Sequence, residues 1–327
     1  MAKIIGNLVP EDDYTHPLGE ETNFNESMYF NFFDPEQSIG GFVRLGNRAN
    51  EGTAEMTVCV YRDDGRVLFN FKRAPIANNE AFDAGGLRFD VIEPSEELST
   101  RYSGGAVELK DARSMSDPAK AFRKSPRRRL EIDLRHRAVG PMYGSSRSRS
   151  EEERNPEKQF GKAHYEQHMH VTGRLQIDDE TLEIDGYGLR DHSWGPRYWQ
   201  AIEGYEWLTM NFGPDFGAMI SVIRRGEGDE KQGGVLVRDG ELSLIKQVSI
   251  ETEFEDNDLY HRGLKVRLET TSGESLVIDG VVKGFIPLRN RRDGRVTHIG
   301  EGMTEWRCGD RVGYGLSEYL SQGAAED

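Results

Sequence analysis

The chain has 327 residues, of which 36% are hydrophobic and 30% are charged, so its composition is neither that of a disordered protein nor that of a membrane-embedded one. Its 42 basic and 57 acidic residues give a net charge of −15. A surface of this sign repels phosphate backbones, which argues against nucleic acid as a partner.

The N-terminal segment and the cysteines predict the cellular location. MAKIIGNLVPEDDYTH has one lysine, no long apolar core and an early acidic cluster, so we expect no signal peptide. No stretch reaches the ~20 apolar residues that span a bilayer, so we expect no membrane insertion. Cys59 and Cys308 are interpreted as free thiols of a reducing compartment, with a disulfide between them left open. Together these features predict a cytoplasmic protein.

Short alternating apolar runs, separated by turn signals, recur along the chain and predict antiparallel β-hairpins. The turns are centred on residues 63–66, 178–180, 239–240, 272–273 and 309–310. Asp-Gly and related pairs supply the positive φ angles that tight hairpins need. Strands at this spacing close as sandwiches or barrels, so the fold class is all-β.

The domain boundary is predicted within residues 144–162, GSSRSRSEEERNPEKQFGK, which contain almost nothing apolar and are typical of an exposed connector. We therefore expect an N-terminal β-domain over residues 1–145, a connector over 146–162 and a C-terminal β-domain over 163–327. Each half contains enough strands for a barrel.

Three other segments carry local predictions. Asp117-Pro118 resembles a helix N-cap followed by a first-turn proline and predicts a short helix over residues 117–124. The basic stretch at residues 123–137 is interpreted as the solvated flank of a strand, with an anion-binding patch as the alternative. Residues 317–327 are expected to fray.

Chemistry-bearing side chains are densest in residues 186–207, GYGLRDHSWGPRYWQAIEGYEW. This segment holds three of the four tryptophans of the chain, Trp194, Trp199 and Trp207, together with several ionisable residues. Aromatic walls and a few polar groups are what a pocket for a bulky apolar ligand needs. The alternative is structural: the tryptophans plug a barrel end and the charged residues pair with their neighbours.

Strand periodicity limits which of these residues can act together. On a regular strand Tyr187 and Asp191 face one side, and Arg190 and His192 face the other. Asp191 and His192 point the same way only if a bulge or turn intervenes, and Gly195-Pro196 is a feature that could produce one.

Two further groups were considered as site residues. In HYEQHMHVTG, residues 164–173, a strand would place His164, Glu166, His168 and His170 on one face, and such a set can ligate a metal. We expect no metal there, because no further cysteine or Asp cluster supports the site. In the first strand, Glu26, Tyr29 and Asn31 form the second group, in which Tyr29 would share a face with Asn31, with ordinary strand packing as the alternative.

The string GYGLRDHSWGPRYW resembles the Gly-Tyr-x-x-x-Asp-His-x-Trp-Gly signature of the hydroxyneurosporene synthase (carotenoid 1,2-hydratase) and AttH-like proteins. It is most similar to a bacterial branch of that superfamily with an Arg-Asp-His-Ser-Trp-Gly core, and residues 26–46 resemble the opening strands of that branch. The resemblance implies two tandem lipocalin-like (calycin-type) antiparallel β-barrels and functional roles for Asp191, His192 and Trp194. Ser193 stands where the hydratase pattern has Asn, so a carotenoid substrate does not follow.

These observations lead to one predicted function and two alternatives. We expect a cofactor-independent hydratase, isomerase, cyclase or lyase that moves protons on a bulky hydrophobic terpenoid, steroid or aromatic substrate. The alternatives are a non-catalytic carrier of hydrophobic ligands and a metal-dependent lyase or oxygenase that uses His164, His168 and His170. The oligomeric state, monomer or homodimer, is left open.

The predicted roles are as follows. Asp191 is the acid or orients His192, the proton shuttle, and Tyr187 assists as a donor. The tryptophans wall the substrate and stabilise a developing cation. The predicted substrate-binding residues are Trp194, Trp199, Trp207, Arg190, Arg197, Tyr29 and Glu203, with the two arginines gripping a polar substituent or locking the loop to Glu203 or Glu206.

Overall fold

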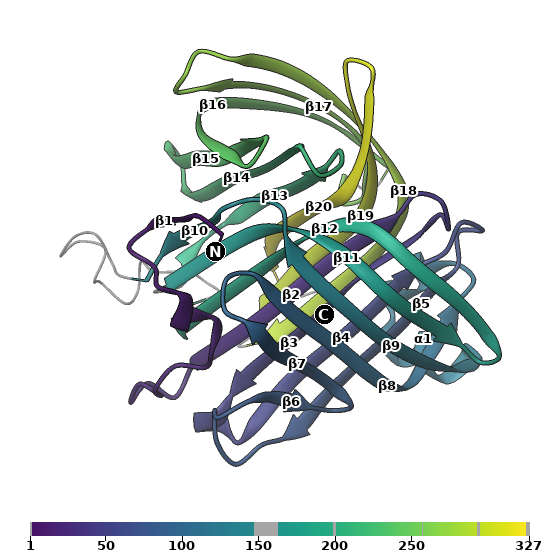
Figure 1. Cartoon of the computed structure of the whole chain (residues 1–327). Helices are drawn as coiled ribbons and strands as arrows, with labels where there is room; N and C mark the ends of the chain where they lie inside the picture. Colours follow the sequence, from purple (N-terminus) through teal and green to yellow (C-terminus); the bar gives the residue numbers. More distant parts are fainter. Residues whose placement is uncertain (1, 147–162, 199–200, 257, 293–294, 325–327) are drawn as a thin grey trace. The chain divides into compact units, whose positions relative to one another are not determined.

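The computed structural model describes residues 2–146, 163–198, 201–256, 258–292 and 295–324. The described chain is almost entirely β-strand, as the sequence predicted (Figure 1). Its contacts divide it into two compact units. Unit 1 comprises Met1–Val60, Leu68–Glu108 and Pro126–Ala201, and unit 2 comprises Tyr61–Val67, Leu109–Ser125 and Ile202–Asp327.

Unit 1 is a sheet in which eight described strands form a closed ring. Neighbouring strands follow the order β11-β12-β2-β3-β4-β5-β8, and β9 pairs with both β8 and β11, which closes the ring. Strands β10 and β1 extend the sheet beside β11, and β7 and β6 extend it beside β8. The bounds are β1 (Ile4–Gly6), β2 (Phe24–Asp34), β3 (Ile39–Arg48), β4 (Thr53–Tyr61), β5 (Val67–Pro75), β6 (Phe82–Ala84), β7 (Leu87–Glu93), β8 (Glu97–Leu109), β9 (Arg127–Ala138), β10 (Met142–Ser145), β11 (Ala163–Ile177) and β12 (Glu180–Pro196).

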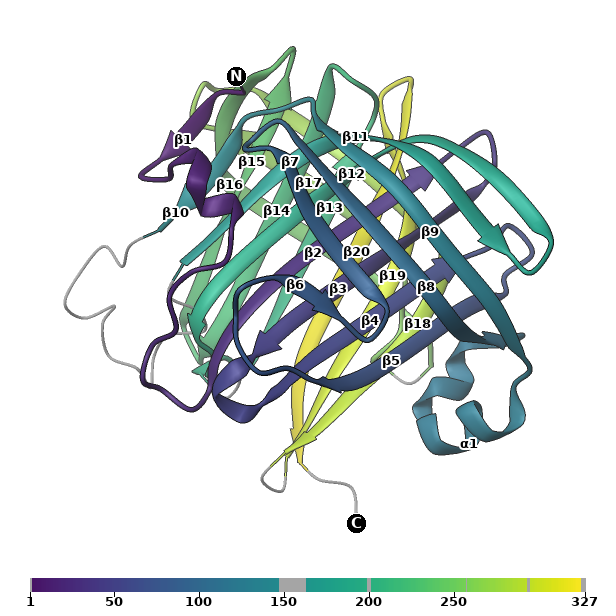
Figure 2. The ribbon, with the colours of Figure 1, turned by 60° about the horizontal axis from the view of Figure 1, so that its bottom comes forward.

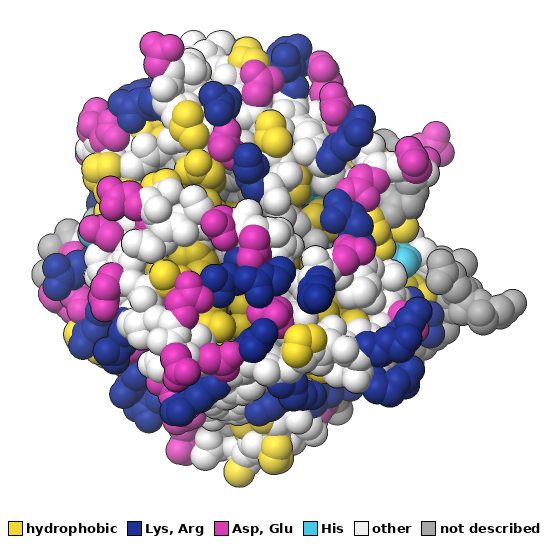
Figure 3. All heavy atoms as spheres, turned by 90° about the vertical axis from the view of Figure 1, so that its right-hand side faces the viewer, with side chains coloured by type: hydrophobic (Ala, Val, Ile, Leu, Met, Phe, Trp, Pro, Cys, Tyr) yellow, Lys and Arg dark blue, Asp and Glu magenta, His cyan; other side chains and the backbone are white. Residues whose placement is uncertain are grey.

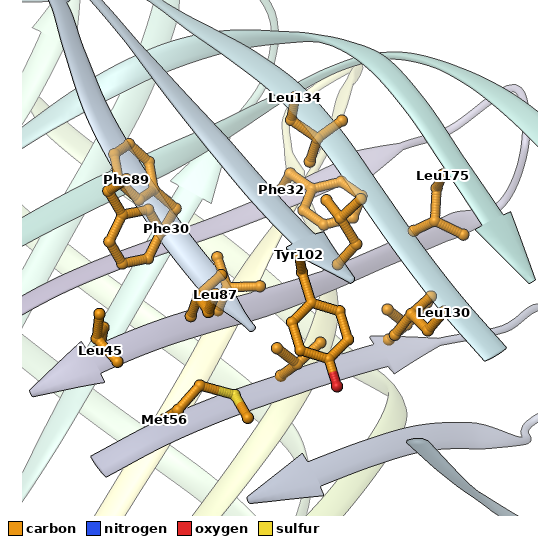
Figure 4. Close-up of a cluster of buried hydrophobic side chains, with 14 of the residues drawn as sticks. Phe30, Phe32, Leu45, Met56, Leu87, Phe89, Tyr102, Leu130, Leu134 and Leu175 are labelled. Carbon is orange, nitrogen blue, oxygen red and sulfur yellow. The ribbon is translucent and has the colours of Figure 1, made fainter. Parts of the chain in front are cut away.

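Large hydrophobic side chains fill the interior of this ring. Figure 4 shows Phe30 and Phe32 of β2 pointing toward the same space as Leu134 of β9 and Leu175 of β11. Burial of each such side chain contributes about 1.5–3 kcal/mol, so this cluster is a main source of stability in unit 1. We call the face of each strand that carries these side chains the core face. Because protein side chains occupy the space, we look for a substrate site on the other face or at an end of the ring.

Unit 2 contains a second closed barrel, formed by eight consecutive strands. Each strand pairs antiparallel with the next, and β20 pairs with β13. Figure 2 shows these strands as the green and yellow ribbons. Their bounds are β13 (Gly204–Asn211), β14 (Phe216–Gly226), β15 (Asp229–Arg238), β16 (Glu241–Phe254), β17 (His261–Thr270), β18 (Ser275–Arg292), β19 (Arg295–Cys308) and β20 (Arg311–Ala324). Its core cluster includes Trp306, which is fully buried.

The five predicted hairpin turns are confirmed. The chain reverses between β4 and β5, β11 and β12, β15 and β16, β17 and β18, and β19 and β20. At Asp239 and Gly240 the φ angles are 51° and 76°, and a two-residue hairpin of this kind requires positive φ at both central positions. The Asp-Gly pair thus sets the geometry of its own turn.

The helix prediction is confirmed, and one prediction for the C-terminus is wrong. Helix α1 (Pro118–Lys124) is capped by Asp117, whose carboxylate accepts a hydrogen bond from the Lys120 amide at 3.1 Å. Residues 317–324 do not fray, because β20 continues through them and pairs with β13 and β19. The sequence shows the turn residues that end β19, but it does not show that the following segment pairs with β13 and β19.

The compact units are divided differently from the halves that composition suggested. The last passage of the chain from unit 1 to unit 2 is between Ala201 and Ile202. The polar connector was placed at residues 146–162, of which those from 147 onward lie outside the described residues. After the connector, β11 and β12 return to the first ring, where β11 pairs with β9 and β12 pairs with β2. Polar composition marks an exposed segment but does not say which sheet the following strand joins.

The basic stretch at residues 123–137 is a paired strand flank. The exposed Arg135 and Arg137 of β9 both contact Glu97, and Arg128 contacts Glu108. Figure 3 likewise shows basic and acidic side chains intermixed on the face in view. Both cysteines are free. No helix among the described residues is long and apolar enough to cross a membrane.

We predict that one buried histidine makes unit 1 sensitive to mild acid. His136 is fully buried against Phe30, and burial, together with the nearby Arg190 cation, lowers its pKa to about 3. A lowered pKa gives stability that is present above pH 6.5, the ordinary value, and is lost as the pH falls toward 3. Between pH 7 and pH 5 the free energy of unfolding should fall by about 2 kcal/mol through this residue.

Urea unfolding at the two pH values measures this effect. The His136→Gln variant should lose about that much of the pH dependence, whatever its stability at pH 7. As a control, His170→Gln on β11, a half-exposed position, should keep the wild-type pH dependence. An equal fall in wild type and His136→Gln would contradict the prediction.

Candidate functional site

The motif at residues 186–199 lies mainly on β12, between β11 and β2 (Figure 2). Asp191 is paired with Glu166 of β11 and with Tyr29 of β2. The register with β2 is continuous from Arg190 to Pro196, and no bulge interrupts it. Alternate side chains of β12 therefore point to opposite faces of the sheet along the whole motif.

This register separates the two residues that the sequence analysis considered together. His192 is on the core face, where it is fully buried, and Asp191 is on the opposite face with 19% of its side chain exposed. The bulge that would have turned both inward does not form, because Gly195 and Pro196 still pair with β2. Asp191 therefore does not orient His192, and each residue belongs to a different cluster.

The opposite-face cluster consists of Tyr143, His164, Glu166 and Asp191. His164 Nε2 contacts the Asp191 carboxylate and lies 3.6 Å from Glu166 Oε1. The Tyr143 hydroxyl donates a hydrogen bond to Glu166, which is almost completely buried. The His164 side chain is 49% exposed, so an imidazole held by a carboxylate is open to solvent.

The charges in this cluster favour protonated His164. Burial opposes protonation, but the Asp191 and Glu166 carboxylates outweigh it and raise the pKa of His164 to about 9. Burial, and then the Glu166 charge, raise the pKa of the Tyr143 hydroxyl well above its ordinary value. At neutral pH the cluster thus presents a cationic imidazole, which can donate a proton, and a neutral phenol, which can donate a hydrogen bond.

The core face carries a separate polar network around Arg190. The Arg190 guanidinium donates to Asp13 at 2.5 Å, to Gln167 Oε1 at 2.6 and 2.9 Å, and to the Tyr165 hydroxyl at 2.9 Å. Tyr165 donates to Asp13 and lies 3.2 Å from His192 Nδ1. Asp13, Arg190 and His192 are fully buried, and each buried charge has a partner of opposite sign or a hydrogen bond.

The network continues from His192 to the N-terminal segment. His192 Nε2 lies 3.1 Å from Glu26 Oε1, and His16 Nδ1 lies 2.6 Å from the same oxygen. The His16 ring stacks on Trp194, with ring centroids 3.8 Å apart and an interplanar angle of 8°. Asn79 also donates to Glu26. The motif thus positions Trp194 as a platform for His16.

Two carboxyl groups of this network keep their charge despite burial. Burial raises the pKa of Asp13, but the Arg190 charge and hydrogen bonds lower it overall. For Glu26, hydrogen bonds from His16 and His192 overcome burial and bring the pKa to about 2. Both residues are therefore anions over the whole physiological range.

The remaining predicted site residues are dispersed. Tyr187 lies on the opposite face of β12, with its ring centroid 5.1 Å from that of His170. Arg197 donates to Ser193 Oγ at 2.8 Å. Glu203 and Trp207 belong to unit 2, and Trp199 lies outside the described residues. Tyr29 is buried beside Phe42 on the opposite face.

The three histidines of β11 share one face but do not converge. His164 contacts Asp191, His170 contacts Asp185 at 2.6 Å, and His168 is buried between them. His164 and His170 are six positions apart on the strand, about 20 Å at roughly 3.3 Å per residue, which is too far for them to share one metal ion. Among the described residues, His164 instead groups with Glu166 and Asp191.

Sequence reasoning missed Asp13, His16, Tyr143 and Tyr165. Tyr165 could have been predicted from strand alternation. It lies between His164 and Glu166 on one strand, so its side chain faces the core when theirs point to the opposite face. The others come from short segments whose contacts depend on tertiary structure. Glu26 was noted in the first strand, but its partners were not predicted.

A hollow of about 400 Å³ lies elsewhere on unit 1, over β7, β8, β9 and β11. Charged residues of both signs line it, including Arg88, Arg101, Glu131, Asp133 and Arg174. No predicted site residue lines this hollow, and its mixed charge matches no single class of ligand. We assign it no role.

Comparison with known proteins places the chain in a family. The family model matches residues 9–323, nearly the whole chain. The chain belongs to the DUF7064 family, a domain of unknown function. No curated protein matches the sequence.

Solved structures similar to this DUF7064 chain share its fold at low identity. An AttH-like protein from Nitrosomonas europaea is 15% identical, with 100% of both chains covered and a TM-score of 0.61. CghA is 12% identical, with 100% and 98% covered and a TM-score of 0.57. Kievitone hydratase from Nectria haematococca is 10% identical, with 98% and 96% covered and a TM-score of 0.56. The predicted resemblance to AttH-like proteins is thus confirmed for the fold.

We predict that Asp191 holds the proton on His164. In Asp191→Asn the pKa of His164 should fall from about 9 toward its ordinary value of 6.5, because the neutral amide no longer stabilises the cation. The stability linked to this raised pKa is fully present below pH 6.5 and is lost as the pH rises through 9. NMR titration of histidine-labelled protein measures the shift. Asp185→Asn, which alters the His170 pair, should leave the high-pKa histidine unchanged.

We also predict that the buried pair of Asp13 and Arg190 is essential for the stability of unit 1. Asp13→Asn leaves the guanidinium buried without its counter-ion, so the free energy of unfolding should fall by about 3–5 kcal/mol. Asp83→Asn is the control, because Asp83 contacts Arg88 at the surface and its loss should change stability little. Denaturant unfolding of both variants measures the difference. A similar loss of unfolding free energy in both variants would contradict the prediction, because burial would then not raise the cost of breaking the Asp13–Arg190 pair.

Proposed function

We propose that this protein is a cofactor-independent enzyme that transfers protons to or from a bulky hydrophobic substrate, as a hydratase, isomerase, cyclase or lyase does. The observation that carries the proposal is the His164 imidazole, half exposed and held by the Asp191 carboxylate. Asp191 keeps the catalytic importance expected from the motif, but it orients His164 in place of His192.

The geometry suggests which nitrogen exchanges the proton. Both carboxylate contacts of His164 are made by Nε2, so Nε2 carries the proton that faces Asp191. Nδ1 is then the nitrogen that gives a proton to the substrate and takes one back. An imidazole with a pKa of about 9 is protonated at neutral pH and begins the cycle as a general acid. Protonation of an alkene or a leaving hydroxyl starts hydration, isomerisation and elimination alike.

A neighbouring aromatic side chain supports a hydrophobic substrate, and the similar structures support the reaction class. Tyr187 lies on the same face of the sheet as His164 and Asp191, and its partly exposed ring supplies aromatic surface. One similar structure is a protein called a hydratase, and another, CghA, was solved with Sch210972. From the hydratase we extend to this chain the reaction class, and from CghA the ability to bind a small molecule. We do not extend the substrate of either protein.

A carrier function is the second candidate, and one observation favours it. The Asp191 carboxylate is already engaged by a cation, which is what a structural ion pair would look like. A carrier would bind the same hydrophobic molecules and return them unchanged. The two functions differ in whether solvent protons enter the ligand.

The experiment is to identify by native mass spectrometry the small molecules that co-purify with the full chain, and then to incubate those molecules with the protein in D₂O. An enzyme of this class incorporates solvent deuterium into carbon. His164→Gln and Asp191→Asn should lower the rate of incorporation by about 10²–10⁴-fold with the fold retained.

His170→Gln is the matched control, because this neighbouring histidine also pairs with a carboxylate on β12 and should leave the rate unchanged. Bound ligand without deuterium incorporation would establish the carrier function. Full activity in a folded His164→Gln variant would show that His164 is not the general acid.

A further inference from the structure

We propose that Nδ1 of His16, Nε2 of His192 and the Glu26 carboxylate bind one divalent transition-metal ion of the zinc class at one end of unit 1. The three donor atoms lie within 4.8 Å of one another. His192 Nε2 and His16 Nδ1 approach the same oxygen of Glu26, at 3.1 and 2.6 Å. Donor atoms of a tetrahedral zinc site, with bonds of about 2.0–2.1 Å, are about 3.3 Å apart, so small movements would seat an ion.

Each histidine ring also has a hydrogen-bond partner at its second nitrogen, the one that faces away from Glu26. The second nitrogen of His16, Nε2, lies 3.2 Å from the Asp12 carboxylate, which only accepts. The second nitrogen of His192, Nδ1, faces the Tyr165 hydroxyl, whose single hydrogen is given to Asp13. Both far nitrogens must therefore carry a hydrogen.

The consequence is that three electron-rich atoms converge. A neutral imidazole with a hydrogen on the far nitrogen presents a lone pair on the near one. In the neutral state, two such lone pairs and one carboxylate oxygen point at a common position. A divalent cation held at that position would take all three atoms as ligands.

The surroundings have the arrangement found around protein metal ligands. Ligating histidines almost always donate their other N–H to a carboxylate, carbonyl or water, and ligating carboxylates are hydrogen-bonded in turn. Here Asp12 is the hydrogen-bond partner of the second nitrogen of His16, and Tyr165 is that of His192. Asn79 donates a hydrogen bond to Glu26. Stacking on Trp194 fixes the plane of the His16 ring. Two imidazoles and one carboxylate suit zinc, which prefers nitrogen and oxygen ligands at such sites.

The three ligands come from distant parts of the chain, so an ion bound by them would link those parts. His16 lies in the segment after the short 3₁₀ helix at Pro10–Asp13, Glu26 is on β2, and His192 is on β12. An ion here would hold the N-terminal segment against the sheet. Glu26 and His192 are fully buried, which suits an ion that stabilises the fold. The site is independent of the proton transfer proposed for the opposite face.

This proposal revises the expectation that no metal binds. That expectation considered only the histidines of β11, and His16 and Glu26 were not part of it. The opposite-face cluster of His164, Glu166 and Asp191 is a weaker candidate, because it offers one nitrogen and two carboxylates, and its histidine is half exposed.

Metal analysis and cobalt substitution test the proposal on the full chain. Protein purified without chelator should contain about one zinc per chain. After chelation, added Co²⁺ should give the intense visible absorption of a tetrahedral nitrogen–oxygen site, and the melting temperature should rise with added Zn²⁺. Absence of zinc, of the cobalt spectrum and of any shift in melting temperature would show that protons occupy the position and would overturn the proposal.

Variants locate the ion. His16→Gln keeps a hydrogen-bond donor beside Glu26 but removes a ligand, and it should abolish the cobalt spectrum while the chain stays folded. Asp12→Asn should weaken zinc binding about 10- to 100-fold, as expected for loss of the carboxylate charge behind a ligand. His170→Gln is the control and should bind like wild type. If His164→Gln abolishes the spectrum and His16→Gln does not, the ion is on the opposite face and the proposal is wrong.

Discussion

The regular alternation of β12 is the constraint on which the candidate sites depend. A strand with no bulge sends consecutive side chains to opposite faces, and β12 pairs continuously with β11 and with β2 through the motif. One short sequence therefore contributes to two chemically different clusters. Asp191 joins His164 on the opposite face, and His192 joins Glu26 on the core face. Neither cluster could have been built from the motif alone.

The core-face network shows how a hydrophobic ring accommodates charge at one end. Arg190 is fully buried, yet Asp13, Tyr165 and Gln167 satisfy its guanidinium. An intact buried ion pair adds little net stability. Removal of one partner destabilises the fold strongly, because it leaves an unpaired buried charge. The motif arginine thus has a structural partner, as the alternative interpretation of the sequence had it, and the catalytic proposal rests on the other face.

In this chain the two faces of the sheet differ in their exposure to solvent. The core face holds fully buried groups, and its polar network is closed to solvent apart from the region of His16. The opposite face presents a half-exposed imidazole beside a carboxylate. Proteins of the same fold include a hydratase, but at 10% identity this likeness extends to the fold only, so the site must be argued from the residues of this chain.

The sequence by itself determined the local structure. Alternating apolar residues and Asp-Gly pairs predicted the hairpins, and Asp117-Pro118 predicted the helix, because turn and cap geometry depends on residues adjacent in the chain. It also indicated the segment that carries the candidate site proposed here. Tertiary structure alone decided the partners: His164 for Asp191, and Glu26 and His16 for His192. These contacts join strands and segments far apart in sequence, and their formation depends on strand register and ring closure, which local residue patterns do not encode.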